Sequence, residues 1–395
     1  MRPITYFALL CLTTIGLALA PTTSNAQQYG PCNAVATVPA CAAPCPAPCA
    51  PPCAAPCVPP CAPTCAQTCA PASCPTCDNW HAPTLQESAV SFSELIGFPC
   101  GPDQPGQQPA SCGPTWTFTA DAIVMQRISL NGVPLALRQT DGATLLNSQN
   151  IQFNDAAGPR FIIARQLNSC CDLQFEYFSI DGSHGFFSAG DANGVQLSNI
   201  APLVQGSAGT NLNFYDHARL YNFELNLRRK TEDGPTFLVG LRWLELQESL
   251  DVNLVTPLVN LPEWNSDANN HLFGGQLGAE WAVWPKGGRF GLDGLVKAGA
   301  YACHAAQVNS SPLYSPTAEA EIDRAAFVGE IGLTAHFQIT DHVLLRGGYQ
   351  LMWIDGIALA PSQIPLTNLS TGTTGINADG GVLYHGGFGG LEVDY

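Results

Sequence analysis

The stretch Tyr221 to Arg228, YNFELNLR, decides the fold class of this chain. Its odd-numbered positions are apolar (Tyr, Phe, Leu, Leu), and its even-numbered positions are polar (Asn, Glu, Asn, Arg). Because successive side chains of a β-strand point to opposite faces, the alternation predicts a strand that separates two different environments. The same pattern recurs from Leu173 to Tyr177, from Phe273 to Val283 and from Phe327 to Gln338.

Ten such segments follow one another up to the final residue, joined by connections that are alternately short and long. Outer-membrane barrels place short turns at the periplasmic end and long loops at the other, whereas a soluble sandwich has no need to do so. The sequence therefore predicts an all-β fold, an antiparallel transmembrane β-barrel of 10 strands, or of 12 if 128–137 and 195–204 also cross. The predicted strands are 115–126, 159–167, 171–180, 216–229, 235–248, 271–284, 289–302, 325–339, 342–354 and 382–395, and the long loops are 127–158, 181–215, 249–270, 303–324 and 355–381. Aromatic residues near the segment ends fit interfacial girdles, although core packing would use the same residues; they are Trp116, Trp243, Trp264, Trp284, Trp353 and Tyr384.

The N-terminus has the features of a secretory signal peptide, residues 1–26. Arg2 precedes an apolar run from Phe7 to Ala20, and small residues lead to a cleavage site after Ala26. No later stretch of about 18 apolar residues is available to form a spanning helix. The chain is therefore expected to be exported and to enter the membrane through strands, which predicts the cell outer membrane as its location.

The charge balance excludes one class of partner. The chain has 15 basic and 31 acidic residues, a net charge of −16, and most of the acids follow Gly113. No basic patch is available to neutralise phosphates, so nucleic acid is not an expected partner. An acidic surface that maintains solubility explains the excess, and attraction of cations to the loops is the alternative.

Residues 27–77 form a low-complexity tract in which Ala and Pro separate cysteines spaced by four, as in CAAPCPAPCAPPC. The prolines oppose a helix and favour polyproline II, which places neighbouring cysteines roughly 12 Å apart at about 3.1 Å per residue. A disulfide needs Cα atoms within about 7 Å, so cross-linking to a copy of the chain or to another envelope protein is one hypothesis. Local pairing through bent Pro turns is the alternative. The candidate cross-linking residues are Cys41, Cys45, Cys49, Cys53, Cys57, Cys61, Cys65, Cys69, Cys74 and Cys77.

Two features of this N-terminal region give weaker signals. Cys74 and Cys77 form a C-x-x-C pair, but no histidine follows at zinc-finger spacing, so no metal site is predicted. Residues 78–113 form a linker in which apolar positions at helical intervals predict a short helix over 84–97, capped by Thr84. This helix can plug the barrel or lie below it, although a surface helix without such a role is favoured. The barrel domain then occupies residues 114–395.

The C-terminal strand carries a family resemblance. Leu391, Val393 and Tyr395 are apolar at alternating positions, which resembles the signal read by the outer-membrane insertion machinery. The runs LRGGYQLMWIDGIALAPSQI (345–364) and GVLYHGGFGGLEVDY (381–395) resemble the β-barrel porins abundant in planctomycete bacteria, a family similar to Legionella-type pore-forming outer-membrane proteins. The resemblance covers residues 115–395 and includes no catalytic or ligand motif. It implies an outer-membrane channel, with outer-membrane lipid and the insertion machinery as partners.

Two functions from different classes remain open. The first is a passive, porin-like diffusion channel with a modest cation preference. The second is a structural envelope protein in which the barrel anchors the cysteine tract, because ten strands make a cylinder that side chains can largely fill. The predicted lumen-lining residues are Glu176, Glu224, Arg228, Arg242, Glu280, Asp293, Lys297, Glu330 and Arg346.

No enzymatic activity and no cofactor are predicted. Asp216 with His217, and Asp341 with His342, are neighbours in sequence. Adjacent residues on a strand point to opposite faces, so neither pair is placed to act as an acid and a base side by side. The chain shows no G-x-S-x-G elbow, phosphate-binding loop or H-E-x-x-H motif.

Overall fold

The computed structural model describes residues 116–167, 170–198, 204–231, 234–284 and 289–395. The signal peptide over 1–26, the cysteine tract over 27–77 and the linker helix over 84–97 lie outside these residues, and the predictions made for them stay predictions. Within the described part of the chain, no helix is both long enough and apolar enough to cross a membrane.

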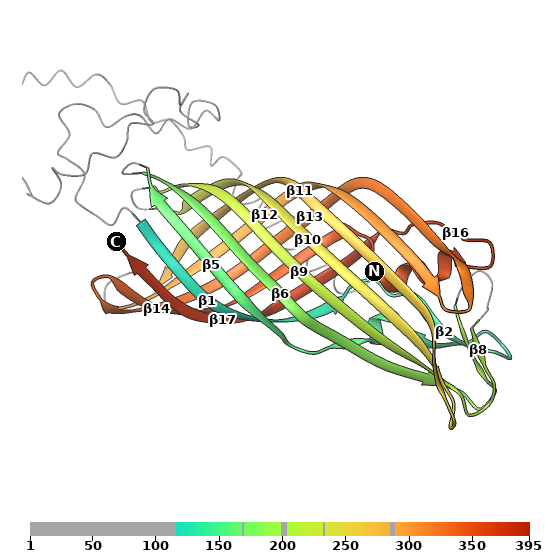
Figure 1. Ribbon diagram of the computed structural model, residues 1–395. Coiled ribbons are helices and arrows are strands. Elements are labelled where there is room, and N and C mark those ends of the chain that lie inside the picture. The colour runs from blue at the N-terminus through green and yellow to red at the C-terminus, as the bar shows by residue number, and fades with distance from the viewer. Residues whose placement is uncertain (1–115, 168–169, 199–203, 232–233, 285–288) are drawn as a thin grey trace, which may run out of the picture. The chain divides into compact units, whose positions relative to one another are not determined.

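Ten long strands of the described chain form one closed antiparallel sheet (Figure 1). They are β1 (Trp116–Ser129), β5 (Ala156–Gln166), β6 (Cys171–Gly190), β9 (Asn211–Arg229), β10 (Thr236–Val255), β11 (Asn260–Trp284), β12 (Phe290–Ser311), β13 (Tyr314–Thr340), β14 (Val343–Ile357) and β17 (Gly380–Asp394). The sheet closes where β1 pairs with β17, with Phe118 opposite Val393. Closure leaves neither of these strands with an unpaired edge. The predicted ten-stranded antiparallel barrel is confirmed.

The two further crossings that the sequence allowed, 128–137 and 195–204, form no additional wall strand among the described residues, and 128–129 belong to β1. Among the described residues they contribute β2 (Pro134–Arg138) and β7 (Val195–Leu197), which pair in a separate sheet with β3 (Thr144–Asn147) and β8 (Gln205–Gly206). These strands are far shorter than the roughly 9 to 11 residues that a spanning strand needs, so the twelve-strand alternative is wrong.

This small sheet is tied together by a charged contact at the surface. The Nε of Arg138 donates to Oδ2 of Asp191 over 3.1 Å. The backbone N–H of Asn193, together with the Arg138 guanidinium, holds the pKa of Asp191 below its ordinary value. Both effects favour the ionised carboxylate, which keeps the 191–194 turn attached to β2.

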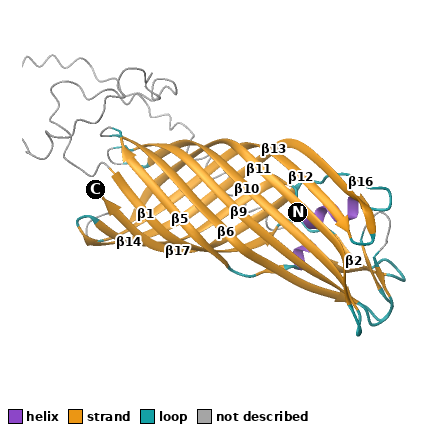
Figure 2. Cartoon of the chain, in the orientation of Figure 1, coloured by secondary structure: helices purple, strands orange, loops and turns teal. Residues whose placement is uncertain are grey.

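The two ends of the barrel differ. Short turns join β5 to β6, β9 to β10, β11 to β12 and β13 to β14 at what we call the short-turn end. At the opposite, long-loop end, three connections carry small elements (Figure 2). These are η1 (Ser148–Asn150), β4 (Gln152–Phe153), α3 (Ala360–Gln363), η2 (Ile364–Leu366), β15 (Thr367–Asn368) and β16 (Thr373–Thr374), in addition to the four-stranded sheet.

Two of the five predicted long loops, 249–270 and 303–324, are wrong as loops, and a third, 181–215, is wrong at both ends, where β6 runs to Gly190 and β9 begins at Asn211. The first two are continuations of the wall, because β10 runs to Val255 before β11 begins at Asn260, and β12 runs to Ser311 before β13 begins at Tyr314. The alternation persists in these extensions, but the polar face is now the outer one. A strand with a polar outer face lacks the apolar outer face of a membrane-spanning segment. For that reason the sequence pattern predicts loops here.

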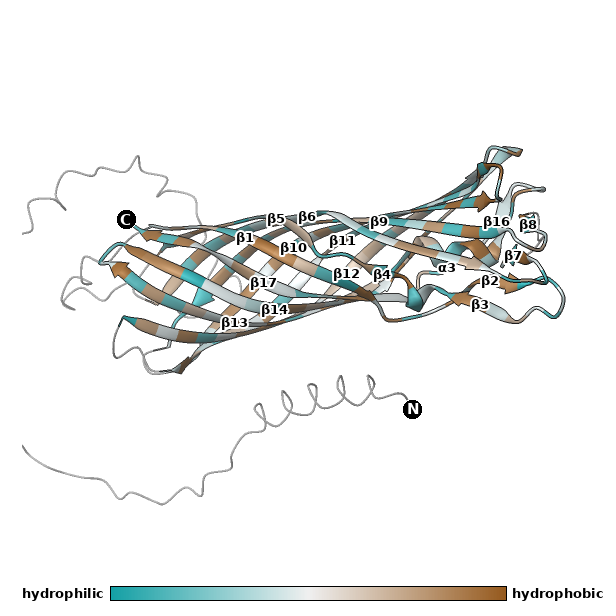
Figure 3. Ribbon diagram, turned by 90° about the horizontal axis from the view of Figure 1, so that it is seen from below, coloured by the Kyte–Doolittle hydropathy of each residue, from teal (hydrophilic) through white to brown (hydrophobic). Residues whose placement is uncertain are grey.

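The outer surface of the wall near the short-turn end is apolar. Leu225, Leu277 and Leu333 point outward and are 46%, 65% and 45% exposed. Apolar and polar residues alternate along the strands (Figure 3). An apolar outer face on a closed sheet is the arrangement that lets a barrel cross a hydrocarbon layer with every backbone group hydrogen-bonded.

Aromatic rings border this apolar belt. The rings of Tyr177 and Phe223 lie 4.7 Å apart, and those of Phe223 and Trp243 lie 5.4 Å apart. Two residues assigned to the girdle from sequence, Trp264 and Tyr384, are instead buried inside the barrel. Proximity to a segment end does not fix the face, and Trp264 points inward to donate its Nε1 to Asn309 Oδ1 over 3.2 Å.

Beyond the aromatic rings, toward the long-loop end, the interior of the barrel is an apolar core. Leu244, Leu246 and Leu250 of β10 point inward and are fully buried. The segment containing α3 closes this end from above. The Asn270 side chain donates to the Ala358 carbonyl over 2.8 Å and accepts from the Ala358 N–H over 2.7 Å, which holds the segment in the barrel mouth.

Candidate functional site: the charged interior

The centre of the barrel holds a buried cluster of charged side chains. Lys297 on β12 lies with its Nζ 3.2 Å from Glu176 Oε2, 3.0 Å from Glu224 Oε2 and 3.5 Å from Glu330 Oε1. All four side chains are at most 5% exposed. Period-2 alternation in β6, β9, β12 and β13 puts these residues on the inner face, and barrel closure brings them together.

Arg242 on β10 forms the second cationic centre of this cluster. Its Nη1 lies 3.1 Å from Glu330 and 3.5 Å from Glu224, and its Nε donates to Asn222 Oδ1 over 2.6 Å. Glu224 also accepts hydrogen bonds from Asn222, Asn226 and Gln276 at 2.7 to 3.1 Å. Each buried carboxylate of the cluster thus faces at least one cation, and Glu224 also has amide donors, which offsets the cost of keeping these charges away from water.

These contacts cross the lumen and do not merely run along the wall. β12 and β6 are separated around the barrel by β11, β10 and β9, so the Lys297–Glu176 contact joins opposite sides. The Arg242–Glu330 contact likewise spans from β10 to β13. Because the bonded side chains of Lys297, Glu176, Glu224 and Glu330 are at most 5% exposed, they occupy the lumen at this level.

A second contact crosses the lumen nearer the long-loop end. Arg127 on β1 forms an ion pair with Glu248 on β10, and both side chains are fully buried. Glu248 Oε2 also accepts the backbone N–H of Ala360 over 2.8 Å, and the Arg127 guanidinium lies 4.3 Å from the centre of the Phe153 ring. The pair therefore fastens the closing segments to the wall.

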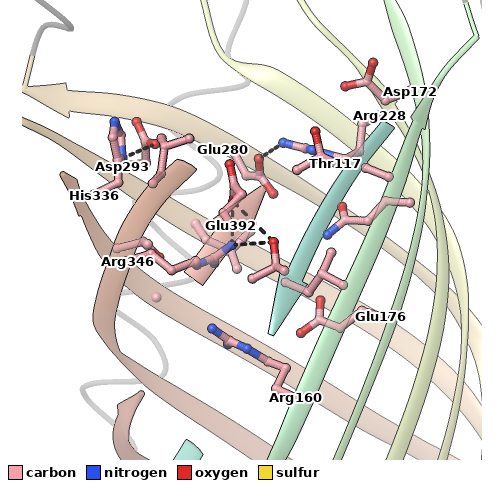
Figure 4. Close-up of a pocket in the computed structure, with 18 of the residues that line it drawn as sticks. Thr117, Arg160, Asp172, Glu176, Arg228, Glu280, Asp293, His336, Arg346 and Glu392 are labelled. Carbon is pink, nitrogen blue, oxygen red and sulfur yellow. Dashed lines mark hydrogen bonds and ion pairs between the residues drawn. The ribbon is translucent and has the colours of Figure 1, made fainter. Parts of the chain in front are cut away.

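Below the central cluster, toward the short-turn end, lies a cavity of about 540 Å³. Ion pairs line it (Figure 4). Arg346 lies 2.9 Å from Glu392, and His336 lies 3.3 Å from Asp293. Arg228 pairs with Glu280 in the same cavity. The cavity ends at the central cluster, so it is a blind pocket.

The nine residues predicted to line the lumen all lie inside the barrel. Seven border the cavity, and Glu224 and Arg242 lie in the buried cluster above it. The prediction missed further inward residues that share the strand parity of those it named. These are Asp121, Arg160, Asn222, Gln276 and Glu392.

Arg160 illustrates what was missed. It donates its Nε to Asp121 over 2.9 Å and its Nη1 to Gln350 over 2.8 Å. The sequence contains a signal for this position, because Asp121 shares the inward parity of Thr119 on β1.

Three residues of the predicted insertion signal lie on the outward face of β17 or at its end. Leu391, Val393 and Tyr395 are 46%, 41% and 84% exposed. They continue the apolar outer belt to the last residue. Their reading by an insertion machinery stays a prediction.

Of the two acidic and histidine pairs, only the first is separated by the wall; the second lies in a turn, so the prediction that its residues point to opposite faces of a strand is wrong. Asp216 points inward and is buried, whereas His217 points outward and is exposed. Asp341 and His342 lie in the turn between β13 and β14.

A closed antiparallel sheet with an apolar outer belt and a charged interior defines an integral-membrane β-barrel. No protein-family model matches the chain, and no curated protein matches its sequence. A comparison with solved structures finds weak similarities. The outer membrane protease OmpT from Escherichia coli is 10% identical, with a TM-score of 0.43, over 73% of this chain and 99% of that one.

Two further solved structures are similar at a lower level. The translocator domain of the autotransporter NalP from Neisseria meningitidis is 8% identical, with a TM-score of 0.32, over 71% of this chain and 89% of that one. The toluene transporter TbuX from Ralstonia pickettii is 10% identical, with a TM-score of 0.28, over 73% of this chain and 92% of that one. These values are too low to carry any activity from those proteins to this chain.

Proposed function

We propose that this chain is an outer-membrane protein whose closed barrel serves as an anchor in the cell envelope. One observation supports this above all others: buried ion pairs join strands that are distant around the barrel, Lys297 of β12 with Glu176 of β6 and Arg127 of β1 with Glu248 of β10. The apolar layer of Leu244 and Leu246, with the α3 segment above it, fills the remaining length toward the long-loop end. A barrel filled in this way holds a protein in the membrane and leaves no route for solutes.

In this proposal the cysteine tract is the part that the barrel anchors. Its Pro-rich sequence predicts polyproline II, in which neighbouring thiols are too far apart to pair, and this favours disulfides to other copies of the chain or to envelope partners. Envelope extracts run without reductant should then show high-mass species that collapse to one band with reductant.

A matched variant tests that role. Replacing the ten cysteines from Cys41 to Cys77 with serine keeps the length and the prolines, and it should abolish the high-mass species while the barrel still folds. Disulfides found by mass spectrometry only within single chains would contradict cross-linking.

A porin-like channel with modest cation preference is the second candidate, and the blind cavity favours it. The cavity admits solutes from the short-turn end as far as Lys297, and acids outnumber bases along its wall. The resemblance of the C-terminal runs to planctomycete β-barrel porins supports the same reading. Conduction then requires that the central cluster and the apolar layer move aside, and the screened lumen charges give a preference that weakens as salt rises.

Planar-bilayer recording separates the two functions. Folded full-length protein should give no steady conductance across a range of voltages, while a known porin reconstituted in parallel conducts. A steady conductance, with a reversal potential in a salt gradient that shows cation preference, would establish the channel and overturn the closed anchor. Fractionation of membranes on a density gradient tests the outer-membrane location independently.

A further inference from the structure

Two histidines on neighbouring strands face each other on the outer surface of the barrel. His184 on β6 lies directly opposite His217 on β9. Their rings are edge-to-face with centroids 4.6 Å apart, and the two Nδ1 atoms approach to 2.5 Å. Both residues are exposed beyond the apolar belt, on the side of the long loops.

A β-bulge creates this pairing. In the first part of β6 the even-numbered residues point inward, as Gln174, Glu176 and Phe178 do. The register shifts between Ile180 and Ser183, where Gly182 adopts a φ of 85°. After the shift Ser183 is the inward residue and His184 points outward, onto the same face as His217. Bulges commonly re-aim a side chain at functional positions.

The approach of the two nitrogens has a chemical consequence. Two neutral imidazoles in this contact share a single proton, with one ring donating and the other accepting. A divalent metal ion can take the place of that proton, because both lone pairs then point at the ion. Metal–imidazole bonds of about 2.0 to 2.1 Å require only a small opening of the pair by side-chain rotation.

The surroundings admit a hydrated cation. The pair borders a surface groove of about 760 Å³ that also contains Asp181, Arg219 and Asp267. Arg219 is engaged by Asp181 over 3.0 Å, and exposed Asp267 adds a negative charge to the groove. In the described part of the chain no group of three or more His, Cys, Asp or Glu residues is arranged to hold a metal. The site is thus a two-histidine chelate, with water supplying the other ligands.

We propose that His184 and His217 together bind one divalent transition-metal ion of the kind that prefers imidazole, such as Zn²⁺, Ni²⁺ or Cu²⁺. Calcium and magnesium, which prefer oxygen ligands, are not expected to bind there. The proposal is independent of whether the barrel conducts.

A second histidine pair provides the control. His271 on β11 lies directly opposite His304 on β12, and both are exposed on the outer face. Their Nδ1 atoms face carboxylates instead of each other, at 3.8 Å to Glu245 and 2.8 Å to Asp323. The two pairs therefore match in register and exposure and differ in the convergence of their nitrogens.

The experiment uses folded full-length protein in detergent, with its thiols alkylated so that the cysteine tract does not bind metal. Calorimetric titration with NiCl₂ measures affinity, and electron paramagnetic resonance with CuCl₂ reports the number of nitrogen ligands. The double variant H184N/H217N should weaken Ni²⁺ binding by roughly tenfold or more, because both imidazole donors are lost. It should also remove a Cu²⁺ signal with two coupled nitrogens.

The control variant H271N/H304N should retain the affinity and the two-nitrogen signal of the parent protein. Heat-modifiable mobility on gels checks that both variants fold. Equal binding by the parent and H184N/H217N would overturn the proposal, as would loss of binding in the control variant alone. Binding of CaCl₂ with the same affinity as NiCl₂ would also contradict an imidazole site.

Discussion

The half of the barrel near the short turns and the half near the long loops use the same strands with opposite polarity. On β10, Arg242 points inward and Leu241 outward in the first half, whereas Leu246 points inward and Gln247 outward in the second. The period of two never changes along the strand. What changes is the medium on each side, from lipid outside and charge inside to water outside and a hydrophobic core inside.

One β-wall can thus face lipid along one part of its length and water along the next. Near the short turns the barrel is built as a membrane protein, and its buried charges neutralise one another across the lumen. Near the long loops it is built like a small soluble barrel, stabilised by apolar burial. The aromatic residues Tyr177 and Trp243 mark the boundary, where amphipathic rings are favoured at a membrane surface.

The largest expected effect comes from breaking the charged interior. Lys297→Met leaves Glu176, Glu224 and Glu330 facing a position without its cation, and it should lower the free energy of unfolding by about 3 to 5 kcal/mol. Urea unfolding in lipid vesicles, followed by tryptophan fluorescence, measures the loss. Lys230→Met is the control, since Lys230 pairs with Asp172 at the half-exposed cavity mouth, and it should cost less than about 1 kcal/mol. Similar losses in both variants would mean that the central cluster is not buried.

The apolar core near the long loops is tested by cavity formation. Leu246→Ala removes a fully buried side chain and should cost about 2 to 5 kcal/mol in the same unfolding measurement. Leu241→Ala, which shortens an outward, lipid-facing residue of the same strand, should cost much less because lipid fills the space. A greater loss at Leu241 than at Leu246 would reverse the assignment of faces.

The exchange of polarity on the outer surface is tested with arginine. Leu225→Arg places a charge in the apolar belt and should cost about 2 to 4 kcal/mol near the bilayer midplane. Gln247→Arg is also outward but lies beyond the belt, and it should change stability by no more than about 0.5 kcal/mol. If both variants lose stability equally, the membrane extends further toward the long loops than the comparison places it.

The smallest effect on stability is expected at the last residue. Tyr395→Ser alters a side chain that is 84% exposed, so the free energy of unfolding should change by no more than about 0.5 kcal/mol. Insertion should nevertheless slow, which pulse-labelled cells show as delayed appearance of the heat-modifiable form. Tyr395→Phe retains the terminal aromatic and should insert at the parent rate. Normal insertion of the serine variant would contradict an insertion signal.

Much of the barrel was predictable because alternation is a local property. YNFELNLR alone shows which residues of β9 share a face, and repeats of that pattern give ten strands in the right places. The parts of the wall that begin at Ser249 and Cys303 were not predicted as strands. Their outer face is polar and their inner face apolar, whereas the sequence criterion for a spanning strand is an apolar outer face. Trp264 and Tyr384 lie near segment ends, which predicts an interfacial position. The face on which a side chain lies depends instead on its parity along the strand, and both residues point inward.

The sequence by itself determined where ten strand segments lie, the direction of most side chains and the polar character of the interior near the short turns, since each depends only on neighbours along one strand; it left open whether two more strands cross. Only the tertiary structure decided that Lys297 meets Glu176, that Arg127 meets Glu248 and that the lumen is filled. Those contacts depend on closure of the sheet and on the stagger between distant strands, which no local pattern records. The bulge that turns His184 toward His217 belongs to the same class, because a one-residue shift in pairing reverses every face that follows it.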